Sequence, residues 1–255
     1  MEAGALSKPF WRRFLWPALL CVFAFAVLMS LGTWQVYRMH WKEALIEDVT
    51  ARLSADPIAL PAANQWTNLK PEEYQYTRVS ITGRFQHKQQ QKSYMVVSNP
   101  KGGRYGGQGH WIMTPFELQS GKLVWVNRGF VPNAFDDSDI TTEFQEDVTL
   151  TGLMRQPEIA TFATPGNSDG FDGNIWFVRN PAAMTAVAKL DGGNVAPFFI
   201  DLDADAGVLL PQSGETRVQF ENRHFGYVLT WYGIALTLLG VFTAFAVREY
   251  KKSRA

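Results

Sequence analysis

The hydrophobic residues of this chain are concentrated near its two ends. One apolar run covers residues 14–36 and a second covers residues 224–247, and neither contains an acidic residue, a lysine or an arginine. Each run has roughly 20 residues, the length that an α-helix needs to cross a hydrocarbon core about 30 Å thick. The pattern therefore predicts two transmembrane helices and a chain that contacts a lipid bilayer.

The residues after the first run keep a helical period. Trp34, Arg38, Trp41 and Leu45 recur at spacings of four, three and four, which places them on one face of a helix. Tryptophan is enriched where a helix leaves the bilayer. The pattern predicts a juxtamembrane helix over 37–55, which Asp56-Pro57 ends.

Residues 56–223 have a different period, with short segments rich in β-branched and aromatic residues between turns of Gly, Pro, Asn and Asp. A single helix is expected at 180–190, where Asn180 provides the cap and Pro181 opens the first turn. We predict one β-rich, mainly antiparallel α+β domain between the spans, a small barrel or a sandwich. The expected strands are 76–86, 92–100, 110–118, 122–132, 147–154, 174–180 and 197–203.

Basic residues predict the orientation of the spans. By the positive-inside rule, residues 1–13 and 248–255 are cytoplasmic and the central domain is extracytoplasmic. Basic residues on the other side of each span weaken this bias.

Ala24-Phe25-Ala26 resembles a signal-peptide cleavage site, but apolar residues continue beyond it, which favours an uncleaved anchor. The N-terminus lacks the character of a transit peptide, which favours a bacterial inner membrane with a periplasmic central domain. The cytoplasmic flanks contain Lys8, Arg12, Arg13, Arg248, Lys251, Lys252 and Arg254.

Composition argues against several classes of function. The 24 basic and 24 acidic residues balance, whereas a nucleic-acid-binding protein has a basic surface. The single cysteine, Cys21, permits neither an internal disulfide nor a covalent haem attachment motif. The Gly-rich stretch 101–110 lacks the GK[ST] and the helix of a phosphate-binding loop. His40, His87 and His110 do not have the spacing of a metal triad, and no catalytic motif is present, so we expect no enzymatic activity.

Helical geometry divides the second apolar run into two faces. Small residues at Gly226, Gly233 and Gly240 fall within one stripe, which we expect to pack against the first span. His224, Tyr227 and Trp231 lie on the opposite face, which would then look outward. A neutral imidazole there suits haem iron, although an interfacial aromatic belt with a titratable neighbour is the simpler interpretation.

Three blocks, in order, resemble the surfeit-locus assembly factors of cytochrome c oxidase. They are "LGTWQVYRMHWKEALI" after the first span, "GHWIMTPFEL" with "KLVWVNRGFVP" in the centre, and "NRHFGYVLTWYGIAL" at the second span. The resemblance covers nearly the whole chain.

This resemblance implies a two-span assembly factor for the oxidase that binds haem a and assists its insertion into the core oxidase subunit. His224 is then the expected iron ligand, with Tyr227 and Trp231 beside the macrocycle and haem a synthase as a possible donor. His40 is a weaker candidate for a second ligand. The alternative is a scaffold that stabilises oxidase assembly intermediates without binding haem.

Overall fold

The computed structural model describes residues 10–101, 104–140, 147–162, 164, 175–204, 210–218 and 220–254. Most of the predicted N-terminal flank (1–9) and two glycines of the Gly-rich stretch (102–103) lie outside these ranges. The chain divides into two compact units, Met1–Asp48 with Gln219–Ala255, and Val49–Val218. We describe each unit by itself.

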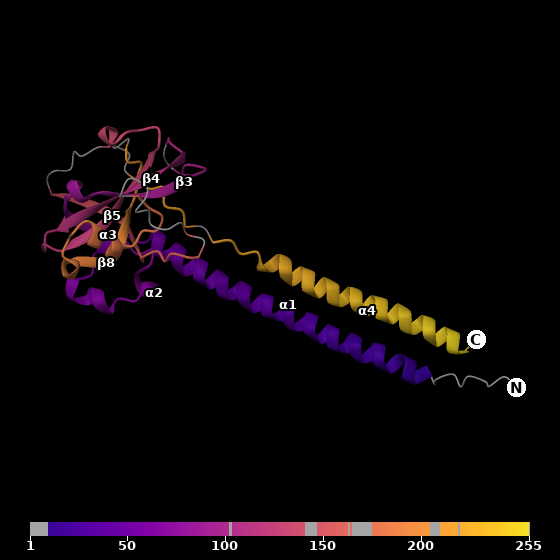
Figure 1. Ribbon diagram of the computed structural model, residues 1–255. Coiled ribbons are helices and arrows are strands. Elements are labelled where there is room, and N and C mark those ends of the chain that lie inside the picture. Colours follow the sequence, from indigo (N-terminus) through magenta and orange to yellow (C-terminus); the bar gives the residue numbers. More distant parts are fainter. Residues whose placement is uncertain are drawn as a thin grey trace. The chain divides into compact units, whose positions relative to one another are not determined.

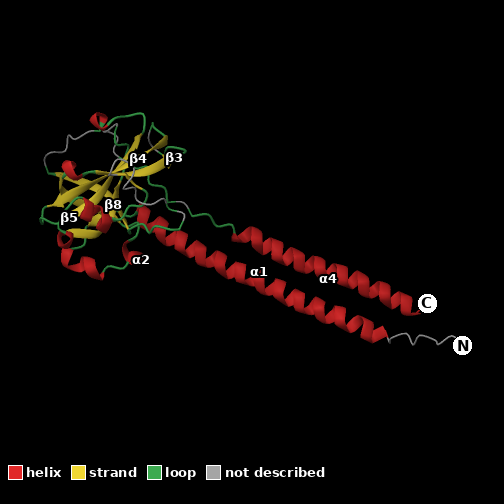
Figure 2. Ribbon diagram, in the orientation of Figure 1, coloured by secondary structure: helices red, strands yellow, loops and turns green. Residues whose placement is uncertain are grey.

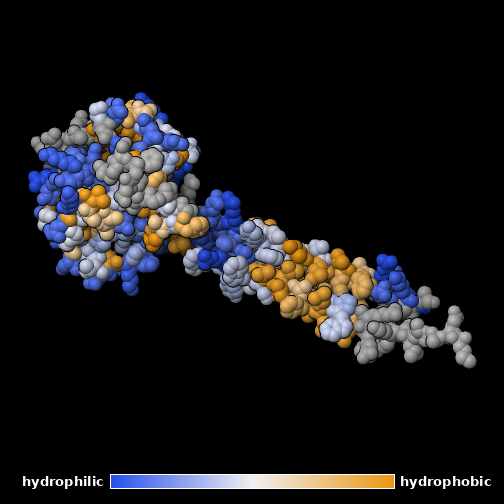
Figure 3. All heavy atoms as spheres, viewed as in Figure 1, coloured by the Kyte–Doolittle hydropathy of each residue, from blue (hydrophilic) through white to orange (hydrophobic). Residues whose placement is uncertain are grey.

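The first unit is a pair of long helices. Helix α1 (Phe10–Ser54) is continuous through the predicted span and the predicted juxtamembrane helix, and α4 (His224–Arg254) contains the second apolar run. Both helices are long and apolar enough to cross a membrane. Large apolar side chains such as Leu20 and Leu236 are about 70% exposed (69% and 70%), and they form an apolar surface along the pair (Figure 3). A surface of this kind is favourable against lipid and costly in water.

The two helices pack side by side and run in opposite directions. The Oγ1 of Thr33 lies 3.2 Å from the phenolic oxygen of Tyr232, and the ring of Phe14 lies 5.4 Å from that of Phe242. The sheltered positions of each helix recur at alternating spacings of three and four, the spacing of a coiled-coil seam. On α4 this seam consists of His224, Val228, Trp231, Ala235, Leu238 and Phe242, with Tyr232 at its edge.

The second unit is a β-barrel with an extension. Strands β2 (Arg78–Phe85), β6 (Val148–Arg155), β8 (Val195–Leu202), β5 (Leu123–Pro132) and β4 (Gly107–Leu118) are neighbours in that order, and pairing of β2 with β4 closes the ring (Figures 1 and 2). Strand β3 (Gln91–Val97) continues the sheet beyond β4, and the two-residue strand β7 (Ile175–Trp176) follows it. The short strand β1 (Ile58–Ala59) pairs with β2.

Alternating side chains fill the two faces of the barrel wall. Along β2 every second residue is buried, and Ile81 joins Phe116 and Phe198 in the barrel interior. The outward residues Trp125 and Phe199 pack instead under α3 (Pro181–Val187), whose Met184 is fully buried. The remaining elements are short: α2 (Pro71–Tyr74) and the 3₁₀ turns Ala63–Asn68, His87–Gln89, Asp137–Asp139 and Gly192–Asn194.

The predicted fold class, two apolar helices around a β-rich domain, is confirmed. Asn180 caps α3 as predicted, because its Oδ1 accepts hydrogen bonds from the N–H groups of Ala182 and Ala183. Two details differ from the prediction. Strand β7 is only two residues long, and β5 pairs with β8 in parallel. Hydrophobic alternation reports which face of a strand is buried but not the direction of its neighbour.

Candidate functional site

The first turn of α4 places His224 in the interface of the helix pair. Its Nδ1 lies 2.7 Å from the Oε1 of Gln35, and Gln35 is only 8% exposed. An amide oxygen only accepts hydrogen bonds, so Nδ1 is the donor. In the neutral imidazole this places the proton on Nδ1 and leaves the lone pair of Nε2 available to a ligand, the arrangement found at histidines that bind metals.

Further contacts fix the register in which Gln35 meets His224. The Nδ2 of Asn222 donates to the carbonyl oxygen of Met39 at 3.3 Å, and the Oδ1 of the same residue accepts from the backbone N–H of His224. Farther along the seam, the ring of Tyr232 lies against Gly32, where an added Cβ would be only 2.5 Å from a ring carbon. A side chain at position 32 would therefore push the two helices apart.

The predicted faces of α4 are reversed in the structure. An added Cβ at Gly226, Gly233 or Gly240 would meet nothing within 4 Å, so this stripe does not pack against α1. His224 and Trp231 are on the packed face instead. The close approach uses a glycine of α1, Gly32, which accepts an aromatic ring of α4. Small residues allow two helices to approach closely, but a stripe of small residues does not show whether it lies in the interface.

The three residues predicted to bind the cofactor are thus in different surroundings. Trp231 is half-buried, and its Nε1 is a buried donor with no hydrogen-bond partner among the described residues. Tyr227 is 55% exposed, at the edge of the face that holds His224 and Trp231. His40, the weaker candidate for a second ligand, is exposed on α1. The described part of the chain contains no group of three His, Cys, Asp or Glu residues that could hold a metal ion.

The barrel unit contains a second polar cluster, which the sequence analysis did not find. Asp201 on β8 is 1% exposed. Its Oδ1 accepts from Asn127 at 2.8 Å and from Arg179 at 3.0 Å, and its Oδ2 accepts from Arg155 at 2.5 Å. Burial alone would raise the pKa of Asp201, but the two guanidinium groups and the hydrogen bonds outweigh burial and hold the pKa below its usual range. Asp201 is therefore a buried carboxylate that stays ionised.

Comparison with known proteins identifies the family. The model of the SURF1 family matches residues 22–236, which include Gln35, His224 and the whole barrel unit. The chain belongs to the SURF1 family. It is 34% identical to the mouse protein "Surfeit locus protein 1" over 224 residues, covering 82% of this chain and 69% of that protein. It is 33% identical to a Drosophila melanogaster "SURF1-like protein", with coverages of 82% and 71%, and 32% identical to human "Surfeit locus protein 1", with 81% and 69%.

Membership in the SURF1 family confirms the resemblance found in the three blocks. Two of these blocks meet in the structure, because Gln35 comes from the block after the first span and His224 from the block at the second. Asn127, in the central block, contacts Asp201. The sequence analysis named His224 but not Gln35. The available signal was an uncharged polar side chain near the end of an apolar run, where burial requires a hydrogen-bond partner.

Proposed function

We propose that this member of the SURF1 family assists the assembly of cytochrome c oxidase by binding haem a and presenting it to the core oxidase subunit, without catalysing a reaction. The observation that carries the proposal is the hydrogen bond from His224 Nδ1 to Gln35 Oε1, which leaves Nε2 available for iron. Haem a, when bound, would supply an iron that the imidazole of His224 could ligate.

Each residue of the site has a separate task in this proposal. Gln35 holds the imidazole in one tautomer and one orientation, because it is itself buried between the helices. Tyr227 offers an exposed aromatic face, and the Nε1 of Trp231 offers a hydrogen-bond donor that no described residue uses. The aromatic side chains suit the apolar part of a tetrapyrrole that approaches from the bilayer.

A single protein ligand suits temporary binding. A carrier must bind its cargo less tightly than the site that finally receives it, and this proposal assigns one ligand, His224. The core oxidase subunit is the proposed receiver, and haem a synthase is a possible source. We propose that the barrel unit is extracytoplasmic, as the charges flanking the spans predict. We propose further that the membrane is a bacterial inner membrane and the barrel unit periplasmic, because the N-terminus lacks the character of a transit peptide.

The test uses the full chain, purified in mild detergent from cells that also make haem a. We expect the wild-type protein to carry the absorption bands of haem a. The variant His224→Ala should lose or shift these bands and keep its helical and β-sheet circular dichroism. His40→Ala is the matched control, because His40 is an exposed histidine of the other helix, and this variant should keep the bands. A colourless wild-type protein would favour the scaffold that stabilises assembly intermediates without haem.

A further inference from the structure

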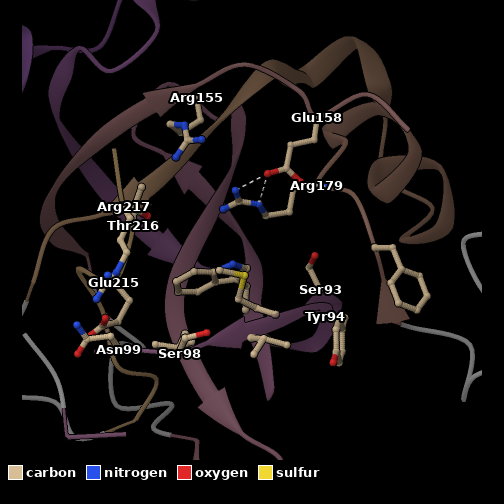
Figure 4. Close-up of a pocket in the computed structure, with 15 residues that line it drawn as sticks. Ser93, Tyr94, Ser98, Asn99, Arg155, Glu158, Arg179, Glu215, Thr216 and Arg217 are labelled. Carbon is tan, nitrogen blue, oxygen red and sulfur yellow. Dashed lines mark hydrogen bonds and ion pairs between the residues drawn. The ribbon is translucent and has the colours of Figure 1, made fainter. Parts of the chain in front are cut away.

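The barrel unit has an open pocket of about 500 Å³ on the outside of the barrel, next to the Asp201 cluster. Residues 93–99, which include the end of β3, form one side of it. Arg155 and Arg179 lie opposite this strand, with Arg217 beside them on a separate segment (Figure 4). Three guanidinium groups from separate parts of the chain therefore line one pocket.

The three arginines differ in how many of their donors are used. All the guanidinium nitrogens of Arg179 are occupied, since Nε and Nη2 donate to Glu158 and Nη1 donates to Asp201. Arg155 donates from Nη1 to Asp201, and its Nη2 has no partner among the described residues. Arg217 is exposed and forms neither a hydrogen bond nor an ion pair with any residue that the structure describes. Two guanidinium groups thus keep free N–H donors at the pocket.

The carboxylates nearby are already engaged. Asp201 is paired with Arg155 and Arg179, and the carboxylate of Glu158 accepts hydrogen bonds from the guanidinium group and from the backbone N–H of Arg179. Glu215 is 3% exposed and accepts from the backbone N–H of Lys101 and from the amide of Gln212. Arg217 pairs with none of these carboxylates among the described residues, so its exposed guanidinium group can still donate to an added carboxylate. The fork of a guanidinium group matches a carboxylate in geometry.

The rest of the pocket suits an apolar group attached to that carboxylate. Trp111 and Val97 belong to one hydrophobic cluster, against which Met95 packs, and Phe177 also lines the pocket. The guanidinium carbon of Arg179 lies 5.9 Å from the centre of the Trp111 ring, so the cation covers an aromatic face. A polar end beside an aromatic wall is typical of sites that bind organic anions.

The outer edge of β3 also runs along this pocket. Strand β7 pairs only with Lys92 and Ser93, and no other described strand pairs with the outer edge of Tyr94–Val97. An extended segment could therefore form hydrogen bonds along this edge while its carboxylate reaches the arginines.

We propose that this pocket is a binding site for a carboxylate carried on an apolar or aromatic body, with Arg155 and Arg217 as the donors. The carboxylate belongs either to a free small molecule or to an acidic residue of an extended segment of a partner protein. The inference is independent of haem a, because it rests only on residues of the barrel unit.

The experiment titrates the full chain in detergent with two probes. One is a fluorescein-labelled, end-capped peptide Thr-Val-Glu-Val-Thr, followed by fluorescence anisotropy, and the other is 1-naphthoate, which should displace it. The neutral analogues, Gln in place of Glu and 1-naphthamide, measure the contribution of the charge. We expect Arg217→Gln to weaken binding of the carboxylates about tenfold, the usual effect of losing a hydrogen bond to a charged group.

The matched control is Arg84→Gln, which removes an exposed arginine of the same barrel that pairs with Glu117 away from the pocket. It should bind the probes as the wild type does, and both variants should keep the wild-type melting temperature. Tighter binding of the Glu peptide than of 1-naphthoate identifies a protein segment as the natural source, and the reverse identifies a small molecule. Equal binding of the carboxylates and their neutral analogues, or unchanged binding in Arg217→Gln, would overturn the proposal.

Discussion

The helix pair and the barrel unit differ in how a buried polar side chain finds its partners. In the barrel unit, Asp201 is ionised and each of its oxygens meets a guanidinium group, with Asn127 completing the cluster. In the helix pair, one hydrogen bond joins the imidazole of His224 to the side-chain amide of Gln35. Removing one member of a buried ion cluster is strongly destabilising, because it leaves a buried charge without its partner. The single hydrogen bond between His224 and Gln35 leaves one nitrogen of the imidazole available.

The two regions also differ in where their apolar side chains point. Phe198 and Phe116 of the barrel are completely buried, whereas Phe23 and Leu236 of the helices are 68% and 70% exposed. The barrel therefore gains stability by removing apolar surface from water. The helix pair gains it from a narrow seam, and its outer surface is suited to lipid. The same large apolar residue types therefore form a buried core in the barrel unit and a lipid-suited surface on the helix pair.

The largest effect is expected from Asp201→Ala. It leaves Arg155 and Arg179 buried without their shared carboxylate, which should lower the free energy of unfolding of the barrel unit by about 3–5 kcal/mol. Thermal unfolding followed by the β-sheet circular dichroism of the full chain measures this. The matched control is Asp203→Ala, which removes a partly exposed ion pair with Arg78 and should cost about 1 kcal/mol or less. Equal losses in the two variants would contradict the role given to the buried cluster.

A smaller loss should follow acidification. The pKa of Asp201 is lower in the folded protein than in the unfolded chain, so its stabilisation is complete above the unfolded pKa and is lost as the pH falls through the folded pKa. The stability of the barrel unit should therefore decline below about pH 4, where an unfolded aspartate begins to take up its proton. The variant Asp201→Asn should show a flatter pH dependence in this range. If the stability of Asp201→Asn falls with pH as steeply as that of the wild type, the acid sensitivity comes from other carboxylates.

In the helix pair, Gly32→Leu should cost about 1–3 kcal/mol, the usual range for overpacking, because the new side chain meets the ring of Tyr232. The melting temperature of the helical circular dichroism in detergent measures it. Gly233→Leu adds the same side chain to α4 where nothing lies within 4 Å, and it should leave the melting temperature unchanged. A larger fall in melting temperature for Gly233→Leu than for Gly32→Leu would instead support packing through the glycine stripe of α4.

The smallest expected effect on stability is that of Gln35→Leu, about 1 kcal/mol for one neutral hydrogen bond. Its effect on the imidazole should be larger. In haem-free protein labelled with ¹⁵N-histidine, the nitrogen shifts of His224 should change from the Nδ1–H tautomer to a mixture, and affinity for haem a should fall about tenfold or more. Thr33→Val removes a neighbouring contact between the helices, to Tyr232, and should leave the His224 shifts unchanged. If the nitrogen shifts of His224 in Gln35→Leu are those of the wild type, Gln35 does not set the tautomer of His224.

Local patterns in the sequence predict much of this fold. Hydrophobic run length gives both helices, alternation gives the strands, and the Asn180-Pro181 pair gives the start of α3. The contacts between distant segments were not predictable in this way. Arg155, Arg179 and Asp201 come from separate elements, and nothing in the residues around each one indicates its partners.

The candidate site shows the same limit. Helical geometry places His224 and Trp231 close to one face, but it does not say whether that face meets α1 or the surroundings. The expectation that glycines form the interface was wrong because the ring of Tyr232 uses Gly32 of the other helix instead. His224 could therefore be selected as a candidate from its position, whereas its partner Gln35 required the structure.

The most direct measurement of the central claim is electron–nuclear double resonance of ferric haem a bound to the purified full chain, with histidine labelled by ¹⁵N. If His224 Nε2 ligates the iron, the spectrum should contain, beside the couplings of the four porphyrin nitrogens, one further nitrogen coupling that changes from ¹⁴N to ¹⁵N with the label and is absent in His224→Ala. A spectrum without a ¹⁵N coupling in the labelled wild type, or a ¹⁵N coupling that persists in labelled His224→Ala, would contradict the account.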